Sequence, residues 1–161
     1  PPGVVVDLHA GPGVGLEAAS SKSSRLVAVD PFEEDLEMVE ERLERRGVAG
    51  LMLRGDYRML GELVREPISL IMVVSPLNLF YDMRSLLTKC MLILDPRGCL
   101  LLVAPLDEPG RVNPLTPYAR ALGAPAQPTI AALEVAVRSE GFRRVRVERE
   151  GVLTILTAIK P

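Results

Sequence analysis

The sequence predicts an α/β fold: one open, doubly wound, mostly parallel sheet with helices on both faces and a C-terminal antiparallel β-hairpin. Apolar runs of strand length alternate with helical patterns along all 161 residues, as in chains built from βα units. Several of these runs are apolar throughout, which is typical of parallel strands that helices cover on both faces. The last two runs are separated only by a short turn, so the final pair is expected to be antiparallel.

Residues 1–161 are expected to form a single domain, because neither an internal repeat nor a low-complexity tract interrupts the chain. The 48% hydrophobic and 25% charged residues are ordinary for a globular protein. The formal net charge of -2 gives no electrostatic case for a nucleic-acid or acidic-membrane partner. No signal peptide is evident and no apolar run reaches the ~18 residues of a membrane span, so we expect a cytoplasmic protein.

Cysteine and histidine usage predicts no metal site. Cys90 and Cys99 lie in apolar stretches and share no metal-ligand spacing with each other or with His9, the only histidine. They are expected to be small buried hydrophobic residues in a reducing compartment, although a disulfide between them stays open. Arginines outnumber lysines and charges are dense on the expected helices, which is compatible with a thermophilic source.

The helix expected at residues 33–46 is the clearest element in the chain. Leu36, Val39 and Leu43 recur at i, i+3 and i+7, which places them on one helix face. Acidic residues crowd the first turn and arginines the last, as the helix dipole favours, and Gly47 ends the helix.

The other elements follow from the same criteria. The expected strands cover residues 4–8, 25–30, 51–54, 68–74, 99–104, 142–148 and 152–159. The other expected helices cover residues from the first glycines to about 23, 57–65, 81–94 and 129–140, with a turn at 95–98. The segment 105–128 is too long for a plain connector and too rich in proline for a flexible linker.

Ligands of open α/β sheets bind at the carboxyl ends of the strands, near the point where strand order reverses. The first strand ends at Asp7 and leads into a loop that contains His9, Gly11 and Gly13. Glycines in such a loop let the backbone approach a ligand closely, and the following helix offers unpaired N–H groups. A glycine-rich loop alone is a weak signal, since a turn that only reverses the chain has the same composition.

Acidic residues also end the next two strands. Asp30 ends the second strand, and its carboxylate suits the two hydroxyls of a ribose. Asp56 follows the third strand, and Ser75 ends the fourth. Each acidic residue alone could cap a helix or lie in a solvated turn, but together they outline an adenosine site.

Two cofactors fit such a site, and charge separates them. A dinucleotide places its pyrophosphate at the helix N-terminus, where the Asp7 carboxylate would repel it. The third glycine of the dinucleotide motif is also missing, because Gly11 and Gly13 are followed by Leu16 at its position. Asp7 would instead attract the cationic amino and sulfonium groups of S-adenosylmethionine, which therefore is the favoured cofactor.

These motifs resemble those of class I (Rossmann-like) S-adenosylmethionine-dependent methyltransferases, over nearly the whole chain and in the right order. The matching stretches are Val-Val-Asp-Leu-His-Ala-Gly-Pro-Gly-Val-Gly at 5–15, Val-Ala-Val-Asp-Pro at 27–31, Arg-Gly-Asp-Tyr at 54–57, Leu-Ile-Leu-Asp-Pro-Arg-Gly at 92–98 and Ser-Glu-Gly-Phe at 139–142.

The resemblance implies a role for each residue of the first two motifs. Asp7 would contact the methionine amino group through water or neighbouring backbone, and Gly11 and Gly13 would allow close approach. Asp30 would bind the ribose hydroxyls, and Pro31 would lie against the adenine.

It also implies roles further along the chain. Asp56 would bond the adenine amino group with Tyr57 beside it, and Ser75 would face the methionine end and the acceptor. The candidates for the acceptor side are Asn78, Tyr81 and the segment 105–128 with Asn113 and Tyr118. The residues after the fourth strand lack the Asn-Pro-Pro-aromatic signature of amino-group methylation.

His9 departs from the family pattern, because it stands where the family has the first loop glycine. Three readings remain open. Its side chain points away from the site, it marks a domain with weakened cofactor binding, or it is a polar group that serves catalysis.

Two functions remain in contention. The first is S-adenosylmethionine-dependent methyl transfer to an unidentified acceptor. The second is a non-catalytic methyltransferase-like subunit for binding or assembly. A nucleotide-binding oxidoreductase is disfavoured by Asp7 and by the terminal hairpin. No catalytic residue is assigned, because in-line methyl transfer depends mainly on positioning. A homo-oligomer is compatible with the sequence but not predicted by it.

Overall fold

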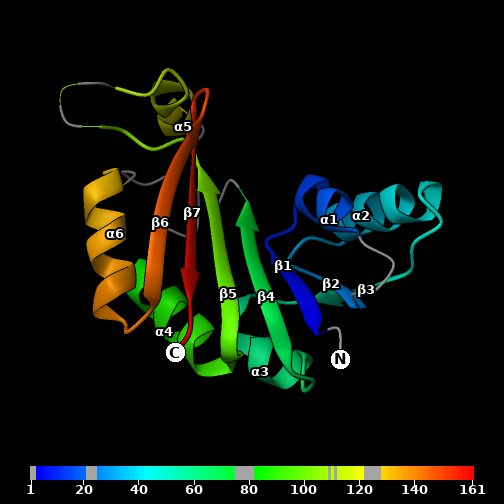
Figure 1. Cartoon of the computed structure of the whole chain (residues 1–161). Helices are drawn as coiled ribbons and strands as arrows, with labels where there is room; N and C mark the ends of the chain where they lie inside the picture. Colours follow the sequence, from blue (N-terminus) through cyan, green and yellow to red (C-terminus); the bar gives the residue numbers. More distant parts are fainter. Residues whose placement is uncertain (1–2, 21–24, 75–81, 109, 111, 122–127) are drawn as a thin grey trace.

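The computed structural model describes residues 3–20, 25–74, 82–108, 110, 112–121 and 128–161. Its seven-stranded sheet has the order β3-β2-β1-β4-β5-β7-β6 (Figure 1). Strands β1 to β5 pair in parallel, and β7 is antiparallel to both β5 and β6. The predicted fold class, a mostly parallel α/β sheet that ends in an antiparallel hairpin, is therefore confirmed.

The expected elements are present with small shifts at their ends. The strands are β1 (Val4–Leu8), β2 (Arg25–Asp30), β3 (Gly50–Arg54), β4 (Ile68–Val74), β5 (Leu94–Ala104), β6 (Arg143–Glu150) and β7 (Leu153–Ile159). The helices are α1 (Val14–Ala19), α2 (Glu33–Arg45), the 3₁₀ helix η1 (Tyr57–Met59), α3 (Leu60–Leu63), α4 (Met83–Ile93), α5 (Thr116–Ala121) and α6 (Ile130–Ser139).

Two boundaries differ by several residues from the sequence prediction, and one helix was not predicted. Helix α1 ends at Ala19 rather than near residue 23, and both the backbone N–H and the hydroxyl of Ser20 donate to the Glu17 carbonyl there. Strand β5 begins at Leu94 rather than 99, because Leu94 already pairs with Ile68 before the register shifts. Helix α5 lies inside the proline-rich segment, where no helix was predicted.

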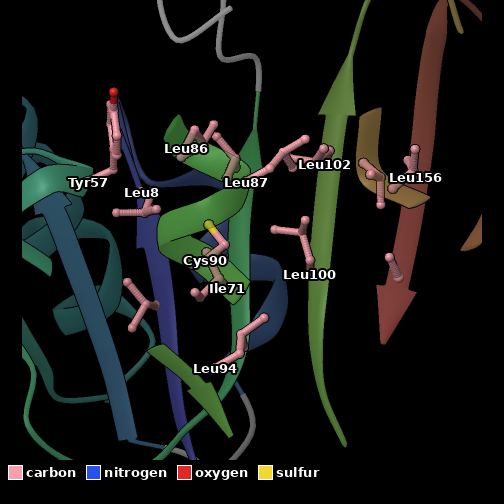
Figure 2. Packing of buried hydrophobic residues seen from close by; sticks show 14 of the residues in the cluster. Leu8, Tyr57, Ile71, Leu86, Leu87, Cys90, Leu94, Leu100, Leu102 and Leu156 are labelled. Atoms are coloured by element: carbon pink, nitrogen blue, oxygen red, sulfur yellow. The ribbon is translucent and has the colours of Figure 1, made fainter. Parts of the chain in front are cut away.

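Two hydrophobic clusters fill the two sides of the sheet. The larger one packs α3, α4 and α6 against alternate residues of the strands, and Figure 2 shows Leu86, Leu87 and Cys90 of α4 among leucines from several strands. The smaller one packs Leu16 of α1 and the predicted α2 stripe against β1, β2 and β4. Both cysteines are free thiols, and burial raises the pKa of Cys90 to about 12.

The two faces of β5 and β7 are covered unequally. Alternate residues of these strands are buried under α4 and α6, and the residues between them are half-buried. Figure 1 shows no helix, within the described part of the chain, in front of β5 and β7. The half-buried face carries Leu101, Val103 and Ile155, so it is largely apolar. Within the described ranges, no helix is both long and apolar enough to cross a membrane.

Candidate functional site

The strand order places the predicted site at one edge of the sheet. From β1 the chain moves outward to β2 and β3, and it then returns to β4 on the opposite side of β1. Such a reversal leaves a crevice at the carboxyl ends of the strands, where ligands of open α/β sheets bind. Asp7 lies in β1, Asp30 is the last residue of β2, and Asp56 follows β3 directly. The structure therefore brings the three predicted carboxyl groups to the same edge.

The loop after β1 is held in a tight, left-handed path. The φ angles are 53° at His9, 48° at Gly11 and 76° at Gly13, a region that favours glycine. The Gly13 N–H donates to the Ala10 carbonyl at 2.9 Å. A Cβ atom on Gly13 would lie 2.9 Å from Val39 Cγ2, so only glycine allows the loop to pack on α2. A Cβ atom on Gly11 would meet nothing within 4 Å, so the loop borders open space there.

Asp30 fixes this loop to the end of β2. Its Oδ2 accepts a hydrogen bond from the Gly11 N–H at 3.1 Å, and its Oδ1 accepts one from the Phe32 N–H at 2.9 Å. The residue is 2% exposed. Each carboxylate oxygen has a second lone pair. A ribose would therefore either share the carboxylate with the two N–H groups or displace the Gly11 N–H.

Asp7 is fully buried, and neither carboxyl oxygen has a hydrogen-bond partner among the described residues. A Cβ atom on Gly15 would lie 2.9 Å from Asp7 Oδ2, so glycine at this position makes room for the carboxyl group. Burial raises the pKa of Asp7 to about 7, with a smaller increase from the negative charge of Asp30, while the backbone of Leu16 lowers it. A carboxyl group with a raised pKa carries less negative charge at neutral pH, which weakens the charge attraction inferred from the sequence.

The negative charges of Asp30 and Asp56 both act on the imidazole of His9. Its backbone N–H continues the ladder by donating to the Val29 carbonyl at 2.8 Å. The side chain is half-buried, and Nε2 is enclosed without a hydrogen-bond partner in the described part of the chain. Burial lowers the pKa of the imidazole, and the charges of Asp30 and Asp56 oppose this shift.

The residues after β3 serve structural roles in this conformation. Asp56 Oδ1 accepts a hydrogen bond from the Arg58 N–H at 2.8 Å and caps η1, the role that the sequence left open for it. Tyr57 is 4% exposed and packs in the larger core beside Leu8 and Leu86 (Figure 2). Its hydroxyl donates to Asp82 Oδ2 at 3.1 Å.

Sequence reasoning missed one residue at the edge of the site. Phe32 follows the half-buried Pro31 and is 61% exposed, an aromatic ring left in solvent next to the end of β2. Its position in the sequence, directly after Asp30 and Pro31, could have indicated that it lies at the site. Ser75, Asn78 and Tyr81 lie outside the described residues.

Asn113 is 3% exposed and binds the segment after β5 to the hairpin turn. Its Nδ2 donates to the Val152 carbonyl at 2.6 Å and lies 3.4 Å from the Leu106 carbonyl, and its Oδ1 accepts from the Leu115 N–H. Tyr118 on α5 is 66% exposed and remains accessible.

A parallel sheet with this order, a glycine loop after β1 and carboxyl groups at three strand ends define a methyltransferase-like Rossmann domain. The family model described as "Methyltransferase domain" matches residues 6–102, which is more than half of the chain. The chain belongs to this family. Among curated proteins, none matches the sequence.

Solved structures share the fold at low sequence identity. A putative O-methyltransferase from Nostoc punctiforme superposes with a TM-score of 0.80 at 20% identity, over 99% of this chain and 53% of its own. Human N-acetylserotonin methyltransferase, solved with S-adenosylmethionine, gives 0.73 at 18% identity, over 98% and 47%. A putative sarcosine dimethylglycine methyltransferase from Galdieria sulphuraria gives 0.75 at 12%, over 98% and 78%. The chain thus spans about half the length of the first two.

Proposed function

We propose that this chain binds S-adenosylmethionine and directs its methyl group to an unidentified acceptor. The arrangement of Asp30 and Gly11 carries the proposal. An acidic side chain is fixed at the end of β2, beside a loop glycine that borders open space. A carboxylate accepts hydrogen bonds from both hydroxyls of a ribose, and the bare backbone at Gly11 allows the ligand to approach closely.

The residues present fit the adenosyl half of the cofactor better than its charged half. Asp30 would hold the ribose, and Pro31 with the exposed Phe32 would border the adenine. The second oxygen of Asp56, which lies 3.9 Å from Arg58 Nε, would be available to the adenine amino group. When bound, the cofactor supplies an electrophilic methyl carbon. The contribution of the chain is then to hold that carbon in line with an acceptor.

A second candidate is a methyltransferase-like binding or assembly subunit with weakened cofactor binding. The observation that favours it is the position of His9, whose imidazole lies within the field of the same two carboxylates that would hold the adenosine. The bond from the Gly11 N–H to Asp30 adds to this, because a ribose would have to share Asp30 Oδ2 with that N–H or displace it.

Calorimetric titration with S-adenosylmethionine, S-adenosylhomocysteine and NAD separates the two candidates. We expect binding of the first two ligands and no heat with NAD. Asp30→Asn removes the charge that strengthens the ribose hydrogen bonds, so we expect the Kd to rise about 30-fold. Glu34→Gln, an equal change of charge on the exposed first turn of α2, is the matched control and should leave the Kd unchanged.

Two outcomes would contradict the proposal. An unchanged Kd in Asp30→Asn would remove Asp30 from the site. No binding by the native chain, together with binding by His9→Gly, would favour the second candidate.

A further inference from the structure

His9 carries two unfavourable features in the ligand-free chain. Its φ of 53° lies in the left-handed region, which an L-residue with a Cβ atom adopts at a cost and glycine adopts freely. Its Nε2 is enclosed and has no hydrogen-bond partner among the described residues. A buried polar atom without a partner is unfavourable, because it has lost water and gained nothing in exchange. Glycine at position 9 would have neither feature.

The register of the sheet places His9 beside Asp30. Leu8 pairs with Val29, and the His9 N–H donates to the Val29 carbonyl, so the next residue on β2 is Asp30. Asp56 acts on the imidazole from the end of β3, so the charges that reach His9 from the ends of β2 and β3 are both negative. Burial favours the neutral imidazole, in which one ring nitrogen donates and the other accepts. A ligand held by Asp30 through its ribose would bring neutral hydroxyl groups next to this ring.

We propose that His9 is a specificity-determining residue of the cofactor site, and that its Nε2 hydrogen-bonds a ribose hydroxyl of the adenosyl ligand. The inference rests on the proposed function. Under this inference the imidazole of His9 strengthens ligand binding. Under the second candidate function it would weaken binding, because it would only obstruct the ligand. Strained backbone together with an unpaired buried atom is characteristic of positions where a ligand completes the interactions.

One variant separates the two roles by the sign of its effect. His9→Gly removes the imidazole and relieves the backbone, so this variant should fold. If Nε2 bonds the ribose, the Kd for S-adenosylhomocysteine rises about tenfold in His9→Gly, which is about 1.4 kcal/mol. His9→Asn retains a polar side chain that tolerates a left-handed backbone, so we expect it to recover a part of the lost affinity. Obstruction predicts a lower Kd in His9→Gly instead.

A change of ligand tests the contact itself. Adenosine and 2′,3′-dideoxyadenosine differ only in the ribose hydroxyls, and competition against S-adenosylhomocysteine measures both. We expect His9→Gly to weaken the binding of adenosine and to leave the binding of dideoxyadenosine unchanged. An equal or lower Kd in His9→Gly overturns this inference while the proposed function stands. An equal loss for adenosine and dideoxyadenosine overturns it too, and no binding by either the native chain or His9→Gly overturns both.

Discussion

Two regions of the sheet differ in the kind of polar side chain that they bury. In the β5–β7–β6 half, Cys99 to Ala104 pair without interruption with β7, and the buried face is apolar except for Thr154. At the carboxyl ends of β1 and β2, two carboxyl groups are buried and the connecting loop is left-handed at His9. The first half is not free of unfavourable features, because Arg97 and Arg144 have left-handed φ angles and the buried Thr154 hydroxyl has no hydrogen-bond partner among the described residues. Only the second half combines buried carboxyl groups with a left-handed histidine, and this combination lies where the strand order reverses, as local inconsistencies do at functional sites.

The largest effect is expected from the hairpin half. Phe142, the residue before β6, is buried in the larger core. Phe142→Ala should lower the free energy of unfolding by about 4 kcal/mol, because it leaves a cavity in a packed core. Denaturant unfolding measures the change, with the exposed Tyr118→Ala as the control, for which we expect less than about 0.5 kcal/mol. The Kd for S-adenosylhomocysteine should stay unchanged in the folded variant. A large rise in this Kd would show that the hairpin half contributes to ligand binding.

The next effect concerns the pH dependence that Asp7 introduces. Its carboxyl group ionises near pH 3.8 in the unfolded chain and near pH 7 in the folded chain, so the folded state binds more protons in between. Stability is therefore greatest below the lower value and falls as pH rises, by about 3 kcal/mol between about pH 4.5 and 7.5. Asp7→Asn should lack this component.

Unfolding of both proteins across this pH range gives the difference directly. The contributions of the other titrating groups to the free energy of unfolding cancel when the native chain and the variant are compared at each pH. A difference that does not change with pH would mean that Asp7 is not a buried, unpaired carboxyl group.

The smallest effect isolates the strain in the loop. His9→Gly and His9→Ala both remove the imidazole, but only alanine keeps a Cβ atom at a left-handed φ. The glycine variant should be more stable than the alanine variant by about 1 kcal/mol, measured by thermal or denaturant unfolding. Equal stabilities, or a more stable alanine variant, would show that residue 9 is not left-handed.

The sequence predicts the elements well because their signals are local. Leu36, Val39 and Leu43 are spaced for one helix face, and all three are buried in α2. The hairpin followed from two apolar runs and a short turn. The start of β5 at Leu94 was missed because it depends on pairing with Ile68, a residue distant in the sequence.

The candidate site was predictable in position but not in contacts. Asp30 lies at its predicted strand end, yet its bond to the Gly11 N–H joins residues 19 apart and has no sequence signature. The unpaired carboxyl group of Asp7 and the enclosed Nε2 of His9 depend on the packing of whole elements. Tyr57 lies buried against α4 because of tertiary contacts that no local pattern encodes.

The half-buried face of β5 and β7 has a consequence for how stability depends on surroundings. On this antiparallel pair the apolar side chains of Leu101, Val103 and Ile155 remain partly in water. That face exists only in the folded chain. Anything that covers it therefore binds the folded state alone and raises the free energy of unfolding by mass action. The stability of this protein then depends on the concentration of any molecule that covers this face, as well as on its own sequence.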